Sequence, residues 1–339
     1  MSYITAQFIQ GAIIHGVSVT TNCQSLGTDG RHLKPDLTKL GIKYRLQPTD
    51  SELVFVDESR IISQMPDLNA GFFENLREYA RTRPIGLFYD QDDTNMIEFP
   101  TEFACFLPHT NCFMTKNPRA IPVQWGASLE TFEEGKLWSK KTQVRSPGSI
   151  VCNFNPTYSQ TVREMILIAT ESRIGSKLML DKRHLFGEEY SSQLRNAQFC
   201  LAFGGSFHWP KTDYSWIREH TSPLAQKFET FPFRSRTVGV LRWDSFRFWE
   251  SMLFGCIPIQ LDFEQYGFVL PVLPTPWLHY IPIDLLNVSS CFERLEDLLR
   301  SPELLSHMAI ATREWANEHY HPSVFFQRVI RDMIGYQKG

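Results

Sequence analysis

The sequence has no apolar stretch long enough to cross a bilayer. Among its 339 residues, no run reaches the roughly 18 to 20 consecutive apolar residues that a membrane-spanning helix needs. Its first residues, Met-Ser-Tyr-Ile-Thr-Ala-Gln, also lack the basic start and the long apolar segment of a signal peptide. We therefore expect no transmembrane segment and a cytoplasmic location, either free or peripheral to a membrane.

Paired cysteine motifs are missing as well. The seven cysteines include no Cys-x-x-Cys pair, and most of them sit in apolar runs. An odd number without metal-ligand spacing is typical of reduced, buried side chains. The pattern indicates a reducing compartment and predicts neither a disulfide framework nor a zinc site.

The sequence also lacks a large excess of charge of either sign. It contains 34 lysines and arginines against 37 aspartates and glutamates, which gives a net charge of −3. This balance argues against a nucleic acid as the partner, although a local basic patch would restore that option. Because 42% of the residues are hydrophobic, the chain is able to bury a substantial core, and its length suggests two domains.

Short apolar strands alternate with helices or loops over the first 125 residues or so. Strands are expected at 53–56, 85–89, 103–107 and 112–115, with a helix at 70–81. The alternation begins again near Gly126. Strands are expected there at 149–154, 177–180, 198–203 and 257–261, and helices at 161–170, 190–196, 285–300, 302–320 and 323–336. Continuous apolar strands that alternate with helices are typical of a parallel sheet covered on both faces.

We therefore predict an α/β fold with two Rossmann-like domains that face a central cleft. The N-terminal domain would cover residues 1–125 and the C-terminal domain residues 126–320. Residues 321–339 would form a C-terminal helix that packs back on the N-terminal domain. The long irregular segment 204–239 is of a kind that is usually functional or mobile.

The most informative segment runs from Arg242 to Ile259. It predicts a loop, a short helix, a glycine stop and an apolar strand broken by Pro258. Ser245 suits the N-cap of the helix, and Gly255 suits its C-terminal end. Free N–H groups at the start of a helix, beside the cation of Arg242, form a site for an anion.

Glu250 follows about one and a half turns into this helix. A phosphate bound at the helix start would leave Glu250 close to an attached ribose, which is the layout expected for a nucleoside diphosphate. A purely structural interpretation stays open beside it, in which the helix only packs on a sheet. The apolar residues at helical spacing that such packing would bury are Phe246, Phe248, Trp249, Leu253 and Phe254.

Four stretches of the second half carry a resemblance to a known family. They are Leu194-Arg195-Asn196-Ala197-Gln198-Phe199-Cys200-Leu201, Arg242-x-x-Ser245-Phe246-Arg247-Phe248-x-Glu250, Gly255-Cys256-Ile257-Pro258-Ile259 and Leu270-Pro271. These stretches resemble the exostosin family of glycosyltransferases, which has the GT-B fold of two Rossmann-like domains. The resemblance covers roughly residues 190–320, and the segment 204–239 matches no feature of that family.

The resemblance implies an inverting glycosyltransferase that is independent of metal ions. Its donor would be a nucleotide diphosphate sugar, most simply a UDP-sugar, used as a co-substrate without a further cofactor. It implies diphosphate binding by Arg242, with Ser245, Phe246 and Arg247 as helpers, and ribose binding by Glu250. In this fold, arginine and a helix N-terminus stabilise the leaving diphosphate in place of a metal ion.

Removal of the proton from the acceptor hydroxyl needs a general base, which we expect on the N-terminal, acceptor-side domain. Asp57 and Asp90 follow predicted strands, and His15 lies in a glycine-bounded segment near the first strand. Each of the three also suits a structural role. His208 and Trp209 are candidates for contact with the sugar or the acceptor, or for a local aromatic cluster.

The spacing of Asp90-Gln91-Asp92 is that of a metal-binding Asp-x-Asp motif. A polar turn after a strand accounts for these three residues better, so we predict no metal site.

The sequence thus predicts an enzyme that moves a sugar from a nucleotide diphosphate to a carbohydrate, a glycoconjugate or another hydroxyl acceptor. Two alternatives stay open. One is a non-catalytic protein of the same fold that binds a nucleotide or a glycan without turnover. The other is a GT-B enzyme that glycosylates a modified nucleic-acid base, which the acidic balance of the chain disfavours.

Overall fold

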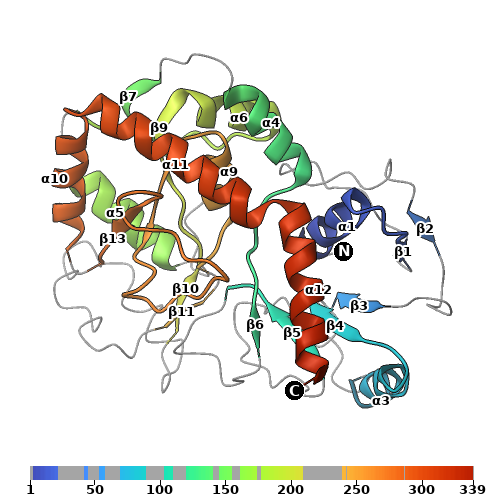
Figure 1. Cartoon of the computed structure of the whole chain (residues 1–339). Coiled ribbons are helices and arrows are strands. Elements are labelled where there is room, and N and C mark those ends of the chain that lie inside the picture. The colour runs from blue at the N-terminus through green and yellow to red at the C-terminus, as the bar shows by residue number, and fades with distance from the viewer. Residues whose placement is uncertain are drawn as a thin grey trace.

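The computed structural model describes most of the chain. The described residues are 3–21, 42–44, 53–57, 69–88, 103–109, 120–139, 145–154, 161–173, 177–208, 239–241, 243–285 and 287–338. Within them the chain forms a four-stranded and a five-stranded parallel sheet with helices around them (Figure 1). No helix in these ranges combines the length and the apolarity that crossing a membrane requires.

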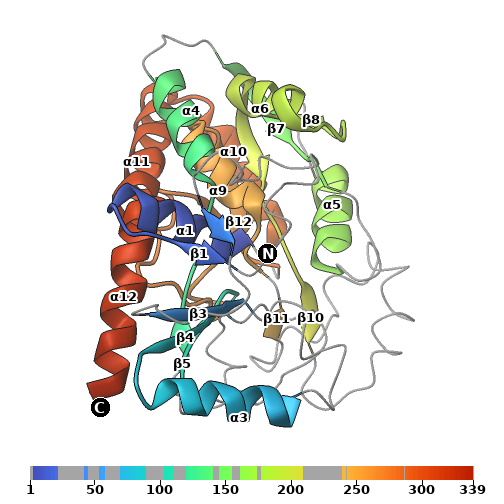
Figure 2. The same cartoon turned by 90° about the vertical axis from the view of Figure 1, so that its right-hand side faces the viewer.

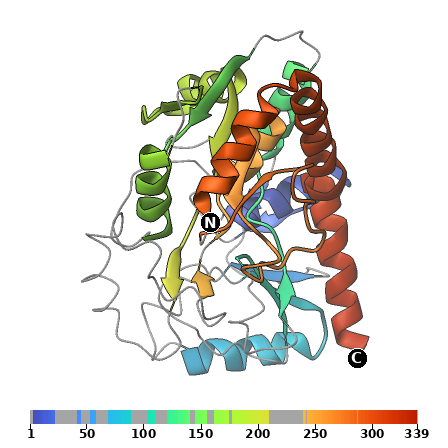
Figure 3. The same cartoon turned by 90° about the vertical axis from the view of Figure 1, so that its left-hand side faces the viewer.

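The four-stranded sheet comes from the first third of the chain. Its strands are parallel and follow chain order: β3 (Val54–Asp57), β4 (Ile85–Phe88), β5 (Ala104–Leu107) and β6 (Ile121–Pro122). α3 (Asn69–Ala80) connects β3 to β4 and lies at one end of the molecule (Figures 2 and 3). Three expected strands and the expected helix are confirmed to within a few residues, and the strand expected at 112–115 lies outside the described residues.

The chain starts with a helix, α1 (Tyr3–Ile14), where the sequence suggested the neighbourhood of a strand. The helix is buried on nearly all sides, so its apolar residues show no one-sided helical pattern that would have distinguished it from a strand. It packs against α12 (Pro322–Lys338) at Gly11, where a Cβ atom would lie 2.2 Å from the Pro322 carbonyl oxygen. Only glycine permits this close approach of the two backbones.

Aromatic rings fill the space between α1, α12 and the four-stranded sheet. Phe8 lies 4.2 Å from Phe55 and 5.3 Å from Phe88, measured between ring centroids. Phe325 and Phe326 reach the same cluster from α12. The C-terminal helix is therefore part of the core of the first sheet, and it lies along that sheet in Figure 1.

The five-stranded sheet has the order β13 (Ile281–Ile283), β12 (Ile257–Leu261), β9 (Ala197–Leu201), β7 (Ser146–Val151) and β8 (Met179–Asp181), all parallel. The chain passes from β7 to β8 through α5 (Thr161–Arg173). It then returns past β7 to β9 through α6 (Gly187–Asn196). The strand order therefore reverses between β7 and β9, and open α/β sheets bind their ligands beyond the carboxyl ends of the strands at such a switch point.

Further elements complete the fold. Within the described residues, the remaining helices are α4 (Leu129–Ser139), α9 (Phe246–Leu253), α10 (Val288–Leu298) and α11 (Pro302–Tyr320). Two strand pairs stand apart from the large sheets: β1 (Thr20–Thr21) with β2 (Lys43–Tyr44), and β10 (Ser206–His208) with β11 (Gly239–Leu241). The α/β class with parallel sheets is confirmed. The assignment of the two sheets to domains 1–125 and 126–320 stays a prediction.

One strand differs in detail from the expectation. β12 is continuous through Pro258, which the sequence suggested would break it. Pro258 is paired with Cys200 of β9, but the Ile259 carbonyl oxygen accepts from Ala202 on that side, so the N–H position of Pro258 faces β13, where pairing begins only at Ile259. The described cysteines, Cys105, Cys152, Cys200, Cys256 and Cys291, are all free and buried.

Candidate donor site at the start of α9

The first turn of α9 lies against the end of β9. Ser245 occupies the N-cap position, with an extended backbone (φ −140°, ψ 150°). Its hydroxyl donates to the carbonyl oxygen of Ala202 at 2.8 Å and makes no capping bond within the helix. The side chain therefore fixes the helix to the strand end, and the N–H groups of the first turn receive no cap from it.

The C-terminal end of α9 is a glycine stop. Gly255 has a φ of +69°, and the Cys256 N–H donates to the Ser251 carbonyl oxygen at 2.8 Å. The Gly255 N–H also donates to the Met252 carbonyl oxygen, which completes a Schellman motif. A side chain at position 255 would strain the backbone, so the sequence turns there into β12.

Two arginines meet the carboxyl ends of the strands at the switch point. The Arg247 Nε donates to the carbonyl oxygen of Asn153, just beyond β7. The Arg163 Nε, from α5, donates to the carbonyl oxygen of Phe203, just beyond β9, at 3.0 Å. Both guanidinium groups lie within about 6 Å of the Phe154 ring, at 6.0 and 5.6 Å. The switch point thus carries two cations beside the start of a helix, an arrangement that suits an anion.

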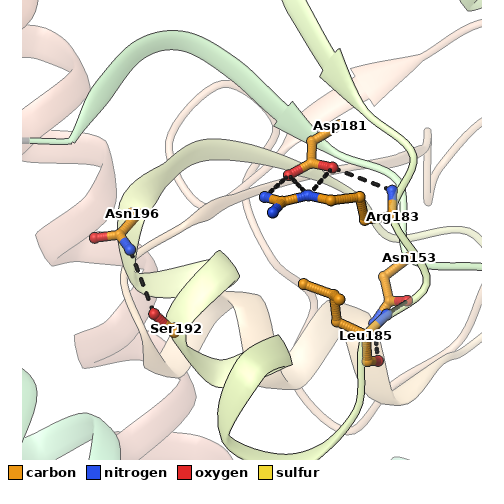
Figure 4. Close-up of polar contacts among 6 residues, drawn as sticks. All are labelled: Asn153, Asp181, Arg183, Leu185, Ser192 and Asn196. Atoms are coloured by element: carbon orange, nitrogen blue, oxygen red, sulfur yellow. Dashed lines mark hydrogen bonds and ion pairs between the residues drawn. The ribbon is translucent and has the colours of Figure 1, made fainter.

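Asn153 also holds the loop between β8 and α6 (Figure 4). Its side-chain amide donates to the Leu185 carbonyl oxygen at 2.9 Å and accepts from the Leu185 N–H at 3.1 Å. In the same loop, Arg183 pairs with Asp181 at the end of β8, and this partner lowers the pKa of the Asp181 carboxyl to about 2. Asn153, whose carbonyl oxygen accepts from Arg247, is therefore itself held by two hydrogen bonds to Leu185.

Glu250 lies one turn beyond Arg247 and is 2% exposed. Burial raises the pKa of its carboxyl to about 7, and the nearby Arg247 guanidinium and Tyr190 hydroxyl oppose that rise. Tyr190 belongs to the first turn of α6, so Glu250 sits between α9 and α6. The structure brings Ser245, Phe246, Arg247 and Glu250 together on one short helix at the switch point.

Asp244 precedes the helix and is buried. Its carboxylate accepts the Trp125 backbone N–H at 2.7 Å and the Trp249 indole N–H at 2.7 Å. Burial raises the pKa of Asp244 to about 7, against the effect of these donors. The Trp125 side chain in turn lies 5.2 Å from the Phe246 ring, so the segment between the two sheets contacts the start of α9.

Several residues predicted from sequence are placed elsewhere or lie outside the described residues. Arg242, Asp90 and Trp209 lie outside them. Asp57 is the last residue of β3, opposite Phe88 at the end of β4.

The two predicted histidines lie at element ends. His208 is the last residue of β10, opposite Gly239 of β11. His15 is exposed just after α1, with its Nε2 2.7 Å from the Ser323 hydroxyl of α12.

His109 is a residue at the site that the sequence reasoning missed. It follows β5 at the carboxyl edge of the four-stranded sheet, with a φ of +57° that is uncommon outside glycine. Its ring stacks on Trp125 at 4.8 Å, and Trp125 contacts Phe246 of α9. The sequence signal for His109 was its position two residues after a predicted strand. Its contact with α9 through Trp125 becomes visible only in the fold.

No protein-family model matches this sequence, and a search of curated proteins gives no match. Solved structures do match over nearly the whole chain. An α-glucosyltransferase in complex with UDP and a 13-mer DNA containing a central A:G mismatch has a TM-score of 0.54 and 11% identity, over 98% of this chain and 95% of that one.

Two further α-glucosyltransferase structures match equally well. The complex with UDP-glucose and DNA containing an abasic site gives a TM-score of 0.53 at 12% identity, over 98% of this chain and 95% of that one. The complex with UDP gives 0.52 at 10% identity, over 98% and 96%. The likeness concerns the fold alone, and it lends no support to membership of the exostosin family.

Proposed function

We propose that the chain is a GT-B glycosyltransferase that binds a UDP-sugar at the start of α9 and transfers the sugar to a hydroxyl group on a modified base in DNA. The position of α9 carries the proposal, because its first turn and two arginines meet at the switch point between β7 and β9. The acceptor is suggested by the α-glucosyltransferases of the same fold, which hold UDP or UDP-glucose together with DNA. The carbohydrate acceptor of the exostosin family has no comparable support.

On the donor side, the reaction breaks the bond between the sugar C1 and the diphosphate oxygen. Charge then develops on the leaving UDP, where Arg242, Arg247 and the N–H groups of the first turn of α9 would stabilise it. Ribose binding by Glu250 stays a prediction of the resemblance, and its 2% exposure means that a ribose could reach the carboxyl group only after the side chain is uncovered. The inverting outcome stays a prediction that rests on the exostosin resemblance.

On the acceptor side, a bond forms between the hydroxyl oxygen and C1, and the hydroxyl proton passes to a general base. Asp57, Asp90 and His15 stay candidates for that base. We add His109, because it alone among the described candidates is linked to α9 by ring contacts, through Trp125.

A transfer assay tests the proposal. The full chain is incubated with UDP-glucose and a duplex that contains one hydroxymethylated pyrimidine, and the DNA is analysed by mass spectrometry. We expect a gain of one hexosyl residue on the modified strand and none on the matched unmodified duplex. A gain on an oligosaccharide acceptor alone would instead favour the carbohydrate acceptor.

A nucleotide panel separates transfer from binding. UDP, GDP, CMP, ADP and TDP are compared by thermal shift, each with and without EDTA. A ligand at about 100 times its Kd stabilises the folded state by roughly 2.7 kcal/mol, so UDP should stand out. We expect the variant Arg242→Ala to remain folded and to lose the UDP response, whereas UDP binding without turnover on any acceptor would favour the non-catalytic alternative.

A further inference from the structure

Asp244 joins two parts of the molecule that are far apart in sequence. One carboxylate oxygen accepts the backbone N–H of Trp125, 119 residues earlier, and the other accepts the indole N–H of Trp249. Both distances are 2.7 Å, and the side chain is 4% exposed. Short bonds from two N–H donors to a buried carboxylate are charge-assisted and leave little freedom for either partner.

The Trp125 segment is itself held from the other side. Its carbonyl oxygen accepts from the Gln7 side chain of α1, and its ring stacks on His109 at the carboxyl edge of the four-stranded sheet. Trp249 packs flat against Trp315 of α11, with ring centroids 6.0 Å apart and an interplanar angle of 9°. Asp244 is therefore the polar junction between the start of α9 and the segment that leads from the first sheet to the second.

We propose that Asp244 is a positioning residue that holds the start of α9 in its donor-binding geometry by fixing it to the Trp125 backbone. This inference rests on the proposed function, since it assigns α9 to the donor. In this role Asp244 touches no substrate. It acts through the start of α9, where its neighbour Ser245 is bonded to Ala202. If the start of α9 is released from Trp125, it would be in the donor-binding conformation for only a fraction of the time. The apparent affinity for the donor would fall by that fraction.

The variant Asp244→Asn tests this role with little change of volume. The asparagine amide has one oxygen that can accept a hydrogen bond, and its NH₂ group must then face the other N–H donor. One of the two hydrogen bonds is therefore lost, because two donors face each other. We expect UDP binding by the full chain, measured by isothermal titration calorimetry, to weaken about tenfold or more. The melting temperature of the variant is measured in parallel.

Tyr266→Phe is the matched control for lost stability. The Tyr266 hydroxyl accepts the Leu285 backbone N–H at 3.0 Å, so its removal also leaves a buried N–H unpaired in the same half of the molecule. We expect this variant to melt at a lower temperature while its Kd for UDP stays within about twofold of the wild type. A merely structural role for Asp244 predicts that both variants change UDP affinity equally little.

A rescue variant keeps the test decisive if Asp244→Asn folds poorly. In the double variant Asp244→Asn/Trp249→Phe the indole N–H is gone, and the single amide oxygen is free to accept from Trp125. We expect the Kd for UDP to return to within about threefold of the wild type. An unaltered affinity in folded Asp244→Asn, or no recovery in the double variant, would overturn the inference. A wild-type protein that binds no UDP would overturn the proposed function, and the inference with it.

Discussion

The contacts that hold helices and loops against the two sheets are not the same. Around the four-stranded sheet, cohesion comes from rings, since Phe8, Phe55 and Phe88 pack with Phe325 and Phe326 of the C-terminal helix. Around the five-stranded sheet, aromatic packing such as that of Trp249 on Trp315 is joined by polar side chains that bind main-chain carbonyl groups just beyond the strand ends. Four such pairs are Ser245 with Ala202, Arg247 with Asn153, Arg163 with Phe203, and Gln260 with Ala202.

The difference matters for function because ring packing has broad angular tolerance, whereas hydrogen bonds fix positions and directions. The five-stranded half therefore defines where the backbone lies at the switch point, which suits recognition of a compact, charged donor. The four-stranded half supplies a stable platform on which edge residues such as His109 are presented. The variants below change a ring, two polar side chains that bind carbonyl groups, and the buried carboxyl group of Glu250.

Removal of an aromatic ring should have the largest effect on stability. Phe88 is 1% exposed and contacts Phe8, Phe55, Phe106 and Phe325. We expect Phe88→Ala to lower the free energy of unfolding by about 3–5 kcal/mol, measured by urea denaturation. UDP affinity in the folded variant should change by no more than about twofold, because the proposed donor site lies at the other sheet. A large loss of affinity would show that the two halves are not independent.

Loss of one half-buried guanidinium should be the next largest effect. Arg145 donates to the carbonyl oxygens of Leu194, Ala197 and Phe254, at the ends of α6 and α9. We expect Arg145→Met to lower the free energy of unfolding by about 2–4 kcal/mol, because three carbonyl groups lose their donor. Arg300→Met is the control, since Arg300 forms only an exposed ion pair with Asp297 and should change stability by less than about 1 kcal/mol.

Glu250 should make stability depend on pH. Its pKa is raised from 4.5 to about 7 by burial, so the folded protein keeps a proton that the unfolded chain has released. The free energy of unfolding therefore falls as pH rises from about 4.5 to about 7, and this effect levels off above that.

We expect Glu250→Gln, which cannot titrate, to reduce the loss of stability between pH 5 and pH 8 by about 1–3 kcal/mol, measured by urea denaturation at both values. Glu303→Gln, at an exposed position on α11, is the control and should leave the pH profile unchanged. An equal profile for wild type and Glu250→Gln would show that Glu250 is not buried as described.

The smallest effect is expected at Ser245. Its hydroxyl donates to the Ala202 carbonyl oxygen, which also accepts from the Gln260 side chain at 3.0 Å. Ser245→Ala therefore leaves that carbonyl bonded, and we expect a loss of only about 0.5–1.5 kcal/mol in thermal or urea unfolding. Ser245→Thr keeps the hydroxyl and should lie closer to the wild type. A loss above about 3 kcal/mol would mean that the Ala202 contact is the main attachment of the helix.

Much of the five-stranded half was predictable because its signals are local. The strand at 257–261, the glycine stop at Gly255 and the helix at 161–173 depend on residues that are close in sequence. The same holds for the strands of the first sheet at 54–57 and 85–88. Where apolar runs are bounded by turn residues, periodicity is sufficient to place an element.

The rest depends on contacts between distant residues. The sequence suggested Ser245 as a cap for its own helix, whereas its hydroxyl reaches Ala202, 43 positions away. The bond of Asp244 to Trp125 spans 119 positions, and the stacking of His109 on Trp125 depends on how β5 approaches α9. α1 escaped prediction because it is buried on nearly all sides. No local pattern encodes such pairings, so they emerge only with the fold.

The most direct test of the donor site is hydrogen–deuterium exchange of the full chain with and without UDP. We predict that UDP slows exchange at the start of α9 (243–250) and in the segments beyond β7 (152–154) and β9 (202–205). Exchange at α3 should be unchanged, because its contacts are with β4 of the other sheet. Protection confined to the four-stranded half, or none in these three segments when calorimetry shows bound UDP, would contradict the placement of the donor at the switch point.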